Sequence, residues 1–250
     1  MMTDVMIGIW IPFLGTALGA ACVFFMRGEM DARVQSALSG FAAGIMVAAS
    51  VWSLLVPAIE RAETWGRLSF LPAVIGLFCG LSVLLTVDVI TPRFFIGKER
   101  RSLMVTAVTL HNFPEGMAVG AVFAGILAGD RGITVAGAMA LSMGIAIQNF
   151  PEGAIISMPR YSAGHSMSKS FFTGVLSGVV EPIGAILTLA AASLAVPALP
   201  FFLGFAAGAM LYVVVGELIP EVNQSHHPYL GNTMFAVGFS LMMALDVSLG

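Results

Sequence analysis

The chain has 250 residues, of which 58% are hydrophobic and only 10% are charged, and its formal net charge is −3. Soluble domains carry about 25% charged residues, so this composition excludes a soluble domain and offers no basic tract for nucleic acid. Apolar runs of about twenty residues also differ from the short alternating segments of a β-barrel. The composition predicts an all-α integral membrane protein with a single transmembrane domain, residues 1–250.

Eight apolar runs with short linkers follow one another along the chain. Each reaches the length of about 20 residues that a helix needs to cross the hydrocarbon core. The predicted spans are 5–26, 34–59, 68–90, 102–128, 132–158, 169–193, 197–221 and 230–249. The two cysteines, Cys22 and Cys79, lie in different runs and are expected to be packing residues.

Basic residues are divided unevenly between the two sides of these spans. Three lie on one side, and eight lie on the other: Arg27, Arg33, Arg93, Lys98, Arg100, Arg101, Arg160 and Lys169. The positive-inside rule puts the larger set in the cytoplasm. We therefore expect both termini to lie outside.

Spans two and seven share a repeat, GFAAGIM at 40–46 and GFAAGAM at 204–210. A proline and a glutamate follow each copy. Because an odd number of crossings separates the copies, they run in opposite directions across the membrane. Inverted repeats around a midplane site are typical of transporters, and the alternative is chance similarity in an apolar background. The repeat predicts eight transmembrane helices in a 3+2+3 inverted-repeat arrangement.

Span four contains the motif HNFPEG at 111–116, far from any predicted loop. Ionisable side chains are costly in hydrocarbon, so within a span they indicate an ion or substrate pathway. Helical spacing puts His111, Asn112 and Glu115 on one side of the helix. Pro114 lacks an amide hydrogen and its ring clashes with the carbonyl group of Leu110, so the helix bends beside these side chains.

Span five repeats the motif as QNFPEG at 148–153, and span six adds Glu181 followed by proline. Three buried carboxylates repel one another unless they are protonated or a cation lies between them. Imidazole, carboxylate and amide donors suit Zn²⁺, with Mn²⁺ and Fe²⁺ as further candidates. For the amides of Asn112, Gln148 and Asn149, hydrogen bonding between helices is the competing interpretation.

These motifs resemble those of the ZIP (Zrt/Irt-like) family of divalent-metal transporters, most closely its GufA-like bacterial branch. The resemblance covers essentially the whole chain. It implies a transporter in a bacterial cytoplasmic (inner) membrane that moves metal from the periplasm to the cytoplasm. Zn²⁺ is the expected cargo, with Cd²⁺, Mn²⁺ and Fe²⁺ as other candidates. The expected partners are metal ions and the lipid bilayer, with a homodimer as an option.

The resemblance also implies a centre for two metal ions. His111, Glu115, Gln148 and Glu152 would form one position, with Met46 as a thioether ligand. Asn112, Glu115, Asn149, Glu152 and Glu181 would form the second, so Glu115 and Glu152 bridge. This chain has Gln148 where relatives commonly have histidine, which softens the preference for zinc. Three carboxylates against two divalent ions also imply a weaker second position.

The family further implies an elevator-like movement. Spans 5–26, 102–128, 132–158 and 169–193 would carry the metal against a scaffold of 34–59, 68–90, 197–221 and 230–249. A selective cation channel that uses the same residues is the alternative function. An intramembrane metal-dependent hydrolase would need an HExxH motif, and the sequence has none, so we expect no enzyme activity.

Further acidic residues lie near the ends of the spans. With both termini outside, Glu60 and Asp246 would attract cations at the outer surface. Glu217 and Glu221 approach the inner surface, and Asp88 belongs either to the inner path or to a helix contact. For each of these, an ordinary interfacial charge is the competing interpretation.

Overall fold

A computed structural model of the chain describes residues 1–26, 30–94, 100–129, 133–192 and 196–249. Within these ranges the side chains of 91–94, 100–108, 110, 111 and 249 lie outside the description. The described residues form helices and connecting turns, without a strand. Together with the apolar character of the helices, this confirms the predicted class of an all-helical integral membrane protein.

The first three helical stretches are each continued or preceded by a differently wound segment. The elements are α1 (Met2–Ala21) with the 3₁₀ segment η1 (Cys22–Phe25), α2 (Ala32–Ala49) with the π segment η2 (Ser50–Leu55) and α3 (Val56–Arg61), and the 3₁₀ segment η3 (Glu63–Leu68) before α4 (Leu71–Phe94). The central pair is α5 (Arg100–Leu127) and α6 (Val135–Ser162). The remainder are α7 (Met167–Gly178), α8 (Val180–Ala190), α10 (Leu199–Val213) with η4 (Val214–Leu218) and α11 (Ile219–Gln224), and α12 (Pro228–Leu249).

Among the described residues, six helical stretches are long and apolar enough to cross a membrane. They are Met2–Phe25, Ala32–Arg61, Leu71–Ile90, Met167–Ala190, Leu199–Gln224 and Pro228–Ser248. The central helices α5 and α6 fall outside this set, because the HNFPEG and QNFPEG motifs interrupt their apolar runs and the described apolar part of α5 is short. The count of eight spans and the 3+2+3 arrangement therefore remain predictions.

Capping side chains explain where several helices begin. Asp31 accepts a hydrogen bond from the amide of Arg33 at the start of α2, and Thr134 accepts one from Gly137 at the start of α6. Ser166 does the same for the amide of Lys169 at the start of α7. Each cap satisfies an amide that the first helical turn leaves without a partner. The predicted span 169–193 corresponds to the helical stretch Met167–Ala190, whose regular winding is interrupted at Val179, between the end of α7 at Gly178 and the start of α8 at Val180.

The two copies of the GFAAG repeat share a structural feature that the sequence did not reveal. Each runs into a π segment, η2 after the first copy and η4 after the second, and each π segment is followed by a proline, Pro57 or Pro220. A proline lacks the amide hydrogen that would bond four residues back, so the preceding turn widens. This correspondence supports a structural repeat between the two spans.

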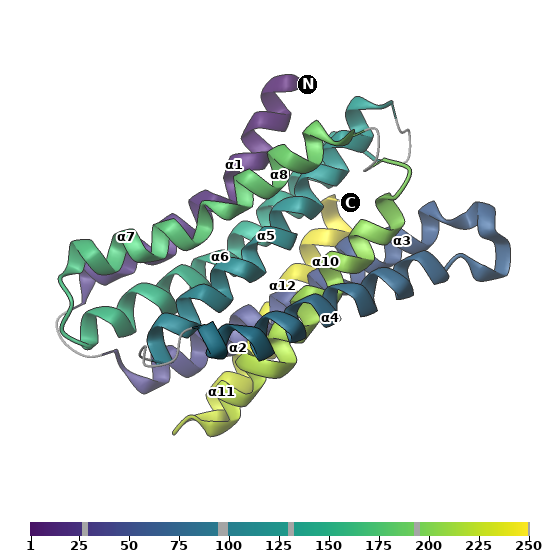
Figure 1. Ribbon diagram of the computed structural model, residues 1–250. Coiled ribbons are helices and arrows are strands. Elements are labelled where there is room, and N and C mark those ends of the chain that lie inside the picture. The colour runs from purple at the N-terminus through teal and green to yellow at the C-terminus, as the bar shows by residue number, and fades with distance from the viewer. Residues whose placement is uncertain (27–29, 95–99, 130–132, 193–195, 250) are drawn as a thin grey trace.

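Four pairs of helices make the most extensive contacts: α1 with α6, α2 with α12, α4 with α10, and α5 with α8. Glycines on these helices touch the partner backbone, which lets helices approach closely in a membrane. Figure 1 shows the helices running along one common direction, with both termini at the same end of the bundle. That placement agrees with an even number of crossings.

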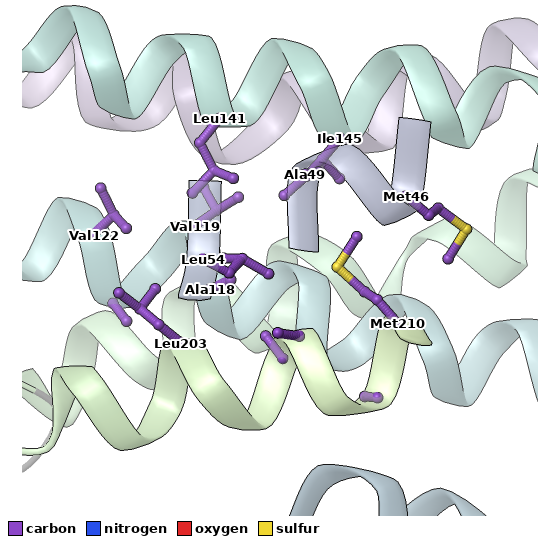
Figure 2. Close-up of a cluster of buried hydrophobic side chains, with 14 of the residues drawn as sticks. Met46, Ala49, Leu54, Ala118, Val119, Val122, Leu141, Ile145, Leu203 and Met210 are labelled. Atoms are coloured by element: carbon purple, nitrogen blue, oxygen red, sulfur yellow. The ribbon is translucent and has the colours of Figure 1, made fainter. Parts of the chain in front are cut away.

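Apolar side chains fill the space between α2 and α10 on one side and α5 and α6 on the other. Figure 2 shows this cluster, in which Met46 and Met210 lie with small and branched side chains such as Ala118, Val119 and Ile145. These contacts hold α5 and α6, and therefore both copies of the motif, in the middle of the bundle.

Candidate metal centre

Polar side chains from α5, α6 and α8 lie buried in the middle of the bundle. Glu115 is 1% exposed, Glu152 8% and Glu181 0%. The amide side chains of the two motifs are buried with them: Asn112, Gln148 and Asn149. Burying carboxylates in such numbers is costly unless partners or a cation compensate them.

The glycine of each motif explains how the carboxylates reach the helix contacts. A Cβ atom added to Gly116 would collide with the carbonyl oxygen of Glu181, and one added to Gly153 would collide with that of Thr16. Each motif therefore packs its helix backbone directly against a neighbouring helix, one residue after its glutamate. The Glu-Gly pair of each motif thus places a carboxylate beside a point where two helix backbones approach closely.

Hydrogen bonds join α5 to α6 and to α8 in this region. Gln148 donates through Nε2 to Oε1 of Glu115 at 2.7 Å. Asn112 donates through Nδ2 to Oε1 of Glu181 at 3.1 Å and to the carbonyl oxygen of Ser177 at 3.3 Å. The competing interpretation of amides that bridge helices therefore holds for the nitrogen atoms of Gln148 and Asn112.

The amide oxygen atoms of Gln148 and Asn112 have no hydrogen-bond partner among the described residues. Because a carboxylate only accepts hydrogen bonds, Gln148 and Asn112 turn their nitrogen atoms toward it and leave their own carbonyl oxygens available. Buried atoms without a hydrogen-bond partner include Glu115 Oε2, Gln148 Oε1, Asn112 Oδ1, Asn149 Oδ1 and Glu181 Oε2. This is a set of oxygen donors of the type that hard and borderline divalent cations bind.

Asn149 and Glu152 lie close to the other members of the cluster. The Asn149 side chain lies near the carboxyl groups of Glu115 and Glu181, although its amide nitrogen has no hydrogen-bond partner. The Glu152 carboxyl group lies within electrostatic range of Glu115 and Glu181, and also of Glu217. From the described residues, the side chains that donate to Glu115 and Glu181 are neutral: those of Gln148, Asn112 and Thr16.

Two predicted ligands of the first position stand apart from this description. The side chain of His111 lies outside the described residues. Met46 is buried in the apolar cluster of Figure 2, on α2. Across the described part of the chain, no three histidine, cysteine or carboxylate side chains are spaced to hold a metal ion by themselves. The oxygen donors of the cluster come from amides as well as carboxylates.

The two acidic residues predicted at the outer surface line one cavity. Glu60 and Asp246 both border a cavity of about 1040 Å³ between α3, α6, α10 and α12. Asp246 accepts a hydrogen bond from Ser53 at 2.6 Å, and its other carboxyl oxygen is buried without a partner. The structure therefore brings these two acidic residues together, on one side of the bundle.

The three residues predicted toward the inner surface are also neighbours. Asp88 accepts a hydrogen bond from the hydroxyl group of Tyr212 at 2.6 Å. Glu221 accepts hydrogen bonds from Gln35 and Ser39. Glu217 lies within electrostatic range of Asp88 and Glu221, and also of Glu152. A series of carboxyl groups thus runs from the central cluster along η4 and α11.

Sequence reasoning missed one buried partner of the cluster. Thr16, on α1, donates a hydrogen bond to Oε1 of Glu181 at 2.7 Å. Its signal was present, since Thr16 is the one hydroxyl-bearing residue between positions 5 and 26. Tyr212 is a second missed partner, through its contact with Asp88.

Comparisons with known proteins identify the family. Residues 97–246 match the family model described as ZIP zinc transporter. The chain is 37% identical to zinc transporter ZIPB of Bordetella bronchiseptica, over 95% of this chain and 79% of the relative. It is 34% identical to zinc transporter GufA of Myxococcus xanthus, over 94% and 96%. It is 33% identical to zinc transporter ZIP11 of Xenopus tropicalis, over 94% of each chain. The chain therefore belongs to the ZIP family, as its motifs indicated, and is a membrane transport protein rather than an enzyme.

Proposed function

We propose that this protein transports divalent metal ions, Zn²⁺ above all, through the cluster of carboxylate and amide groups on α5, α6 and α8. The observation that carries the proposal is the set of buried oxygen atoms without protein partners, from Glu115, Asn112, Gln148, Asn149 and Glu181. A divalent cation would bind these oxygens and offset the mutual repulsion of the glutamates. The names of the bacterial relatives, both zinc transporters, agree with this cargo.

Two metal positions fit the way in which the free oxygen atoms are distributed. Glu115 Oε2 and Gln148 Oε1 belong to the first, which His111, Glu152 and Met46 would complete. The free oxygens of Asn112, Asn149 and Glu181 belong to the second. Glu115 and Glu152 would bridge the two positions. The absence of thiolate from this donor set favours moderate affinity, which suits an ion that must be released, and leaves room for Cd²⁺, Mn²⁺ and Fe²⁺.

The direction of transport follows from the distribution of charge. With the larger basic set in the cytoplasm, metal would enter through the cavity of Glu60 and Asp246 and leave along Glu217, Asp88 and Glu221. Both groups are acidic and would concentrate cations at their end of the path. The protein would thus import metal across a bacterial cytoplasmic membrane with both termini outside.

We expect wild-type protein in proteoliposomes to take up Zn²⁺ saturably, and Glu152→Ala to abolish that uptake, because one of the two bridging carboxylates is lost. The measurement is uptake of Zn²⁺, Cd²⁺, Mn²⁺ and Fe²⁺ by both proteins. Wild-type uptake that does not differ from empty liposomes for any of these ions would contradict the proposal. Unitary currents in planar bilayers would instead favour the selective channel.

The movement that carries the metal divides the helices into two groups. The first, which we call the carrier group, contains α1, α5, α6, α7 and α8, and the second, the scaffold group, contains α2, α3, α4, α10, α11 and α12. Each of the four most extensive helix pairs lies within one group, which supports the division. The surface between the groups contains the apolar cluster of Figure 2, and apolar contacts suit sliding.

A reversible cross-link tests this movement. Gly144 on α6 faces Met242 on α12, because a Cβ atom added at Gly144 would lie 2.7 Å from the sulfur of Met242. In a variant without native cysteines, we expect a disulfide between Gly144→Cys and Met242→Cys to stop zinc uptake and a reductant to restore it.

A matched cross-link within the scaffold group provides the control. The hydroxyl oxygens of Ser36 and Ser225 lie 3.0 Å apart, so Ser36→Cys and Ser225→Cys can form a disulfide there. Uptake should persist with this second disulfide formed. Undiminished uptake with the first disulfide fully formed would exclude a movement between α6 and α12.

A further inference from the structure

We propose that Thr16 is a positioning residue of the metal centre, whose hydroxyl group holds the Glu181 carboxylate so that Oε2 faces the bound ion. The proposal rests on the proposed function, because it takes Glu181 to be a metal ligand. It adds a residue from α1 to a centre whose carboxylate and amide side chains lie on α5, α6 and α8.

The hydrogen bonds at Glu181 are distributed unequally between its two oxygen atoms. Thr16 Oγ1 donates to Oε1 at 2.7 Å, and Asn112 Nδ2 donates to the same atom at 3.1 Å. Oε2 is buried and has no partner. Two hydrogen bonds to the same oxygen fix the plane of the carboxylate. Oε2 is then the one oxygen of Glu181 that is left to bind a metal ion. Glu181 would therefore bind metal through one oxygen rather than two.

The backbone around Thr16 holds its side chain in one place. A Cβ atom at Gly153 would collide with the carbonyl oxygen of Thr16, so α6 lies directly against this residue. On the other side, a Cβ atom at Gly178 would lie 2.8 Å from Thr16 Cβ and 3.0 Å from Oγ1. Thr16 thus occupies space that Gly153 and Gly178 leave open. Gly153 directly follows Glu152, and Gly178 lies just before α8.

The chemistry of a hydroxyl group suits this role. A neutral donor stabilises a buried carboxylate without cancelling the charge that attracts a cation. A lysine or arginine at position 16 would pair with Glu181 permanently and compete with the metal. The Thr16 hydroxyl group therefore keeps Glu181 available as a ligand in the absence of metal.

A contact that only joins α1 to α8 would have different consequences from a contact that orients a ligand. Loss of a contact that only joins α1 to α8 would lower the stability of the protein and leave the zinc concentration at half-saturation unchanged. Loss of a positioning contact should weaken zinc binding itself. The test therefore measures equilibrium zinc binding to the purified full chain together with the concentration dependence of uptake.

We expect Thr16→Val, which keeps the shape and removes the donor, to raise the half-saturating zinc concentration about tenfold in both measurements, as for loss of one hydrogen bond to a charged group. Thr16→Ser keeps the donor and should restore the wild-type value. Thr188→Val is the matched control, because Thr188 is a buried threonine on α8 whose hydroxyl, among the described residues, donates to the backbone carbonyl of Gly184. It should leave zinc binding unchanged.

A double-mutant cycle shows whether Thr16 acts through Glu181. Once Glu181→Gln has removed the charged ligand, adding Thr16→Val should change zinc binding no further. A tenfold loss that persists in this background, or wild-type binding by Thr16→Val alone, would overturn the assignment. Failure of the wild-type chain to bind and transport zinc would instead overturn the proposed function.

Discussion

Glu115→Gln is expected to reduce zinc uptake by at least about 100-fold. This is more than the loss expected when a metal ligand loses one of its hydrogen-bond partners. Glu115 is almost fully buried, one oxygen accepts from Gln148, and the other is free. As a bridging ligand it would serve both metal positions, so its charge is lost from both at once. The glutamine keeps the size of the side chain, and the protein should still fold, since replacing a buried carboxylate by an amide removes a repulsive charge.

The measurement is the initial rate of radioactive zinc uptake into proteoliposomes that contain equal amounts of each protein. Asp31→Asn is the control, because it makes the same carboxylate-to-amide change at an exposed position and keeps a side chain that can cap α2. It should transport as the wild type does. Uptake by Glu115→Gln within a factor of two of the wild-type rate would show that this carboxylate is no ligand of the transported ion.

Gly116→Ala is expected to lower the free energy of unfolding by about 3 kcal/mol, the upper end of the cost of adding a methyl group to a packed contact. The added Cβ atom would collide with the carbonyl oxygen of Glu181, a backbone atom that cannot move without shifting α8. In an open helical position the same substitution would be neutral or favourable, since alanine is the better helix former. A decrease in the free energy of unfolding would therefore indicate that α5 and α8 are in contact at Gly116.

Gly216→Ala, in η4, supplies that open position, because no atom from a neighbouring helix lies within 4 Å of a Cβ built at Gly216. Thermal unfolding of the purified proteins in detergent should show a large decrease in midpoint for Gly116→Ala and no decrease for Gly216→Ala. Equal midpoints for the two variants would mean that α5 and α8 do not approach at Gly116. The proximity of Glu115 and Glu181 would then lose its structural basis.

Much of the fold class can be predicted because hydrophobicity acts locally along the chain. The run 68–90 and the helix α4 coincide closely, and the turn chemistry of Asp31 and Thr134 lies just where α2 and α6 begin. The division of the predicted span 169–193 at Val179 has a signal in Pro182, which lacks an amide hydrogen and whose ring clashes with the carbonyl group of Gly178, the last residue of α7. The π segments are not predictable, because a proline indicates a bend and leaves open how the preceding turn adapts.

The central cluster can be predicted because a carboxylate beside a proline in an apolar run has few purely structural roles. Thr16 gives a much weaker signal, as the one hydroxyl-bearing residue between positions 5 and 26, because a lone threonine is tolerated anywhere in a membrane helix and its role depends on which helix lies opposite. Met46 shows the reverse case. The family resemblance implies a ligand there, whereas its surroundings are the apolar side chains of Figure 2, so its role as a ligand remains a prediction. Packing partners of this kind are set by tertiary structure alone.

The three glutamates of α5, α6 and α8 are proposed to share a cation in the middle of the bundle. The most direct measurement is anomalous diffraction at the zinc absorption edge from crystals grown with Zn²⁺. We expect an anomalous peak within bonding distance of Glu115, Glu152 and at least one amide oxygen, with Glu181 beside a second, weaker peak. Peaks confined to the acidic residues at the ends of the spans, with Glu115 bonded only to protein groups, would contradict the account.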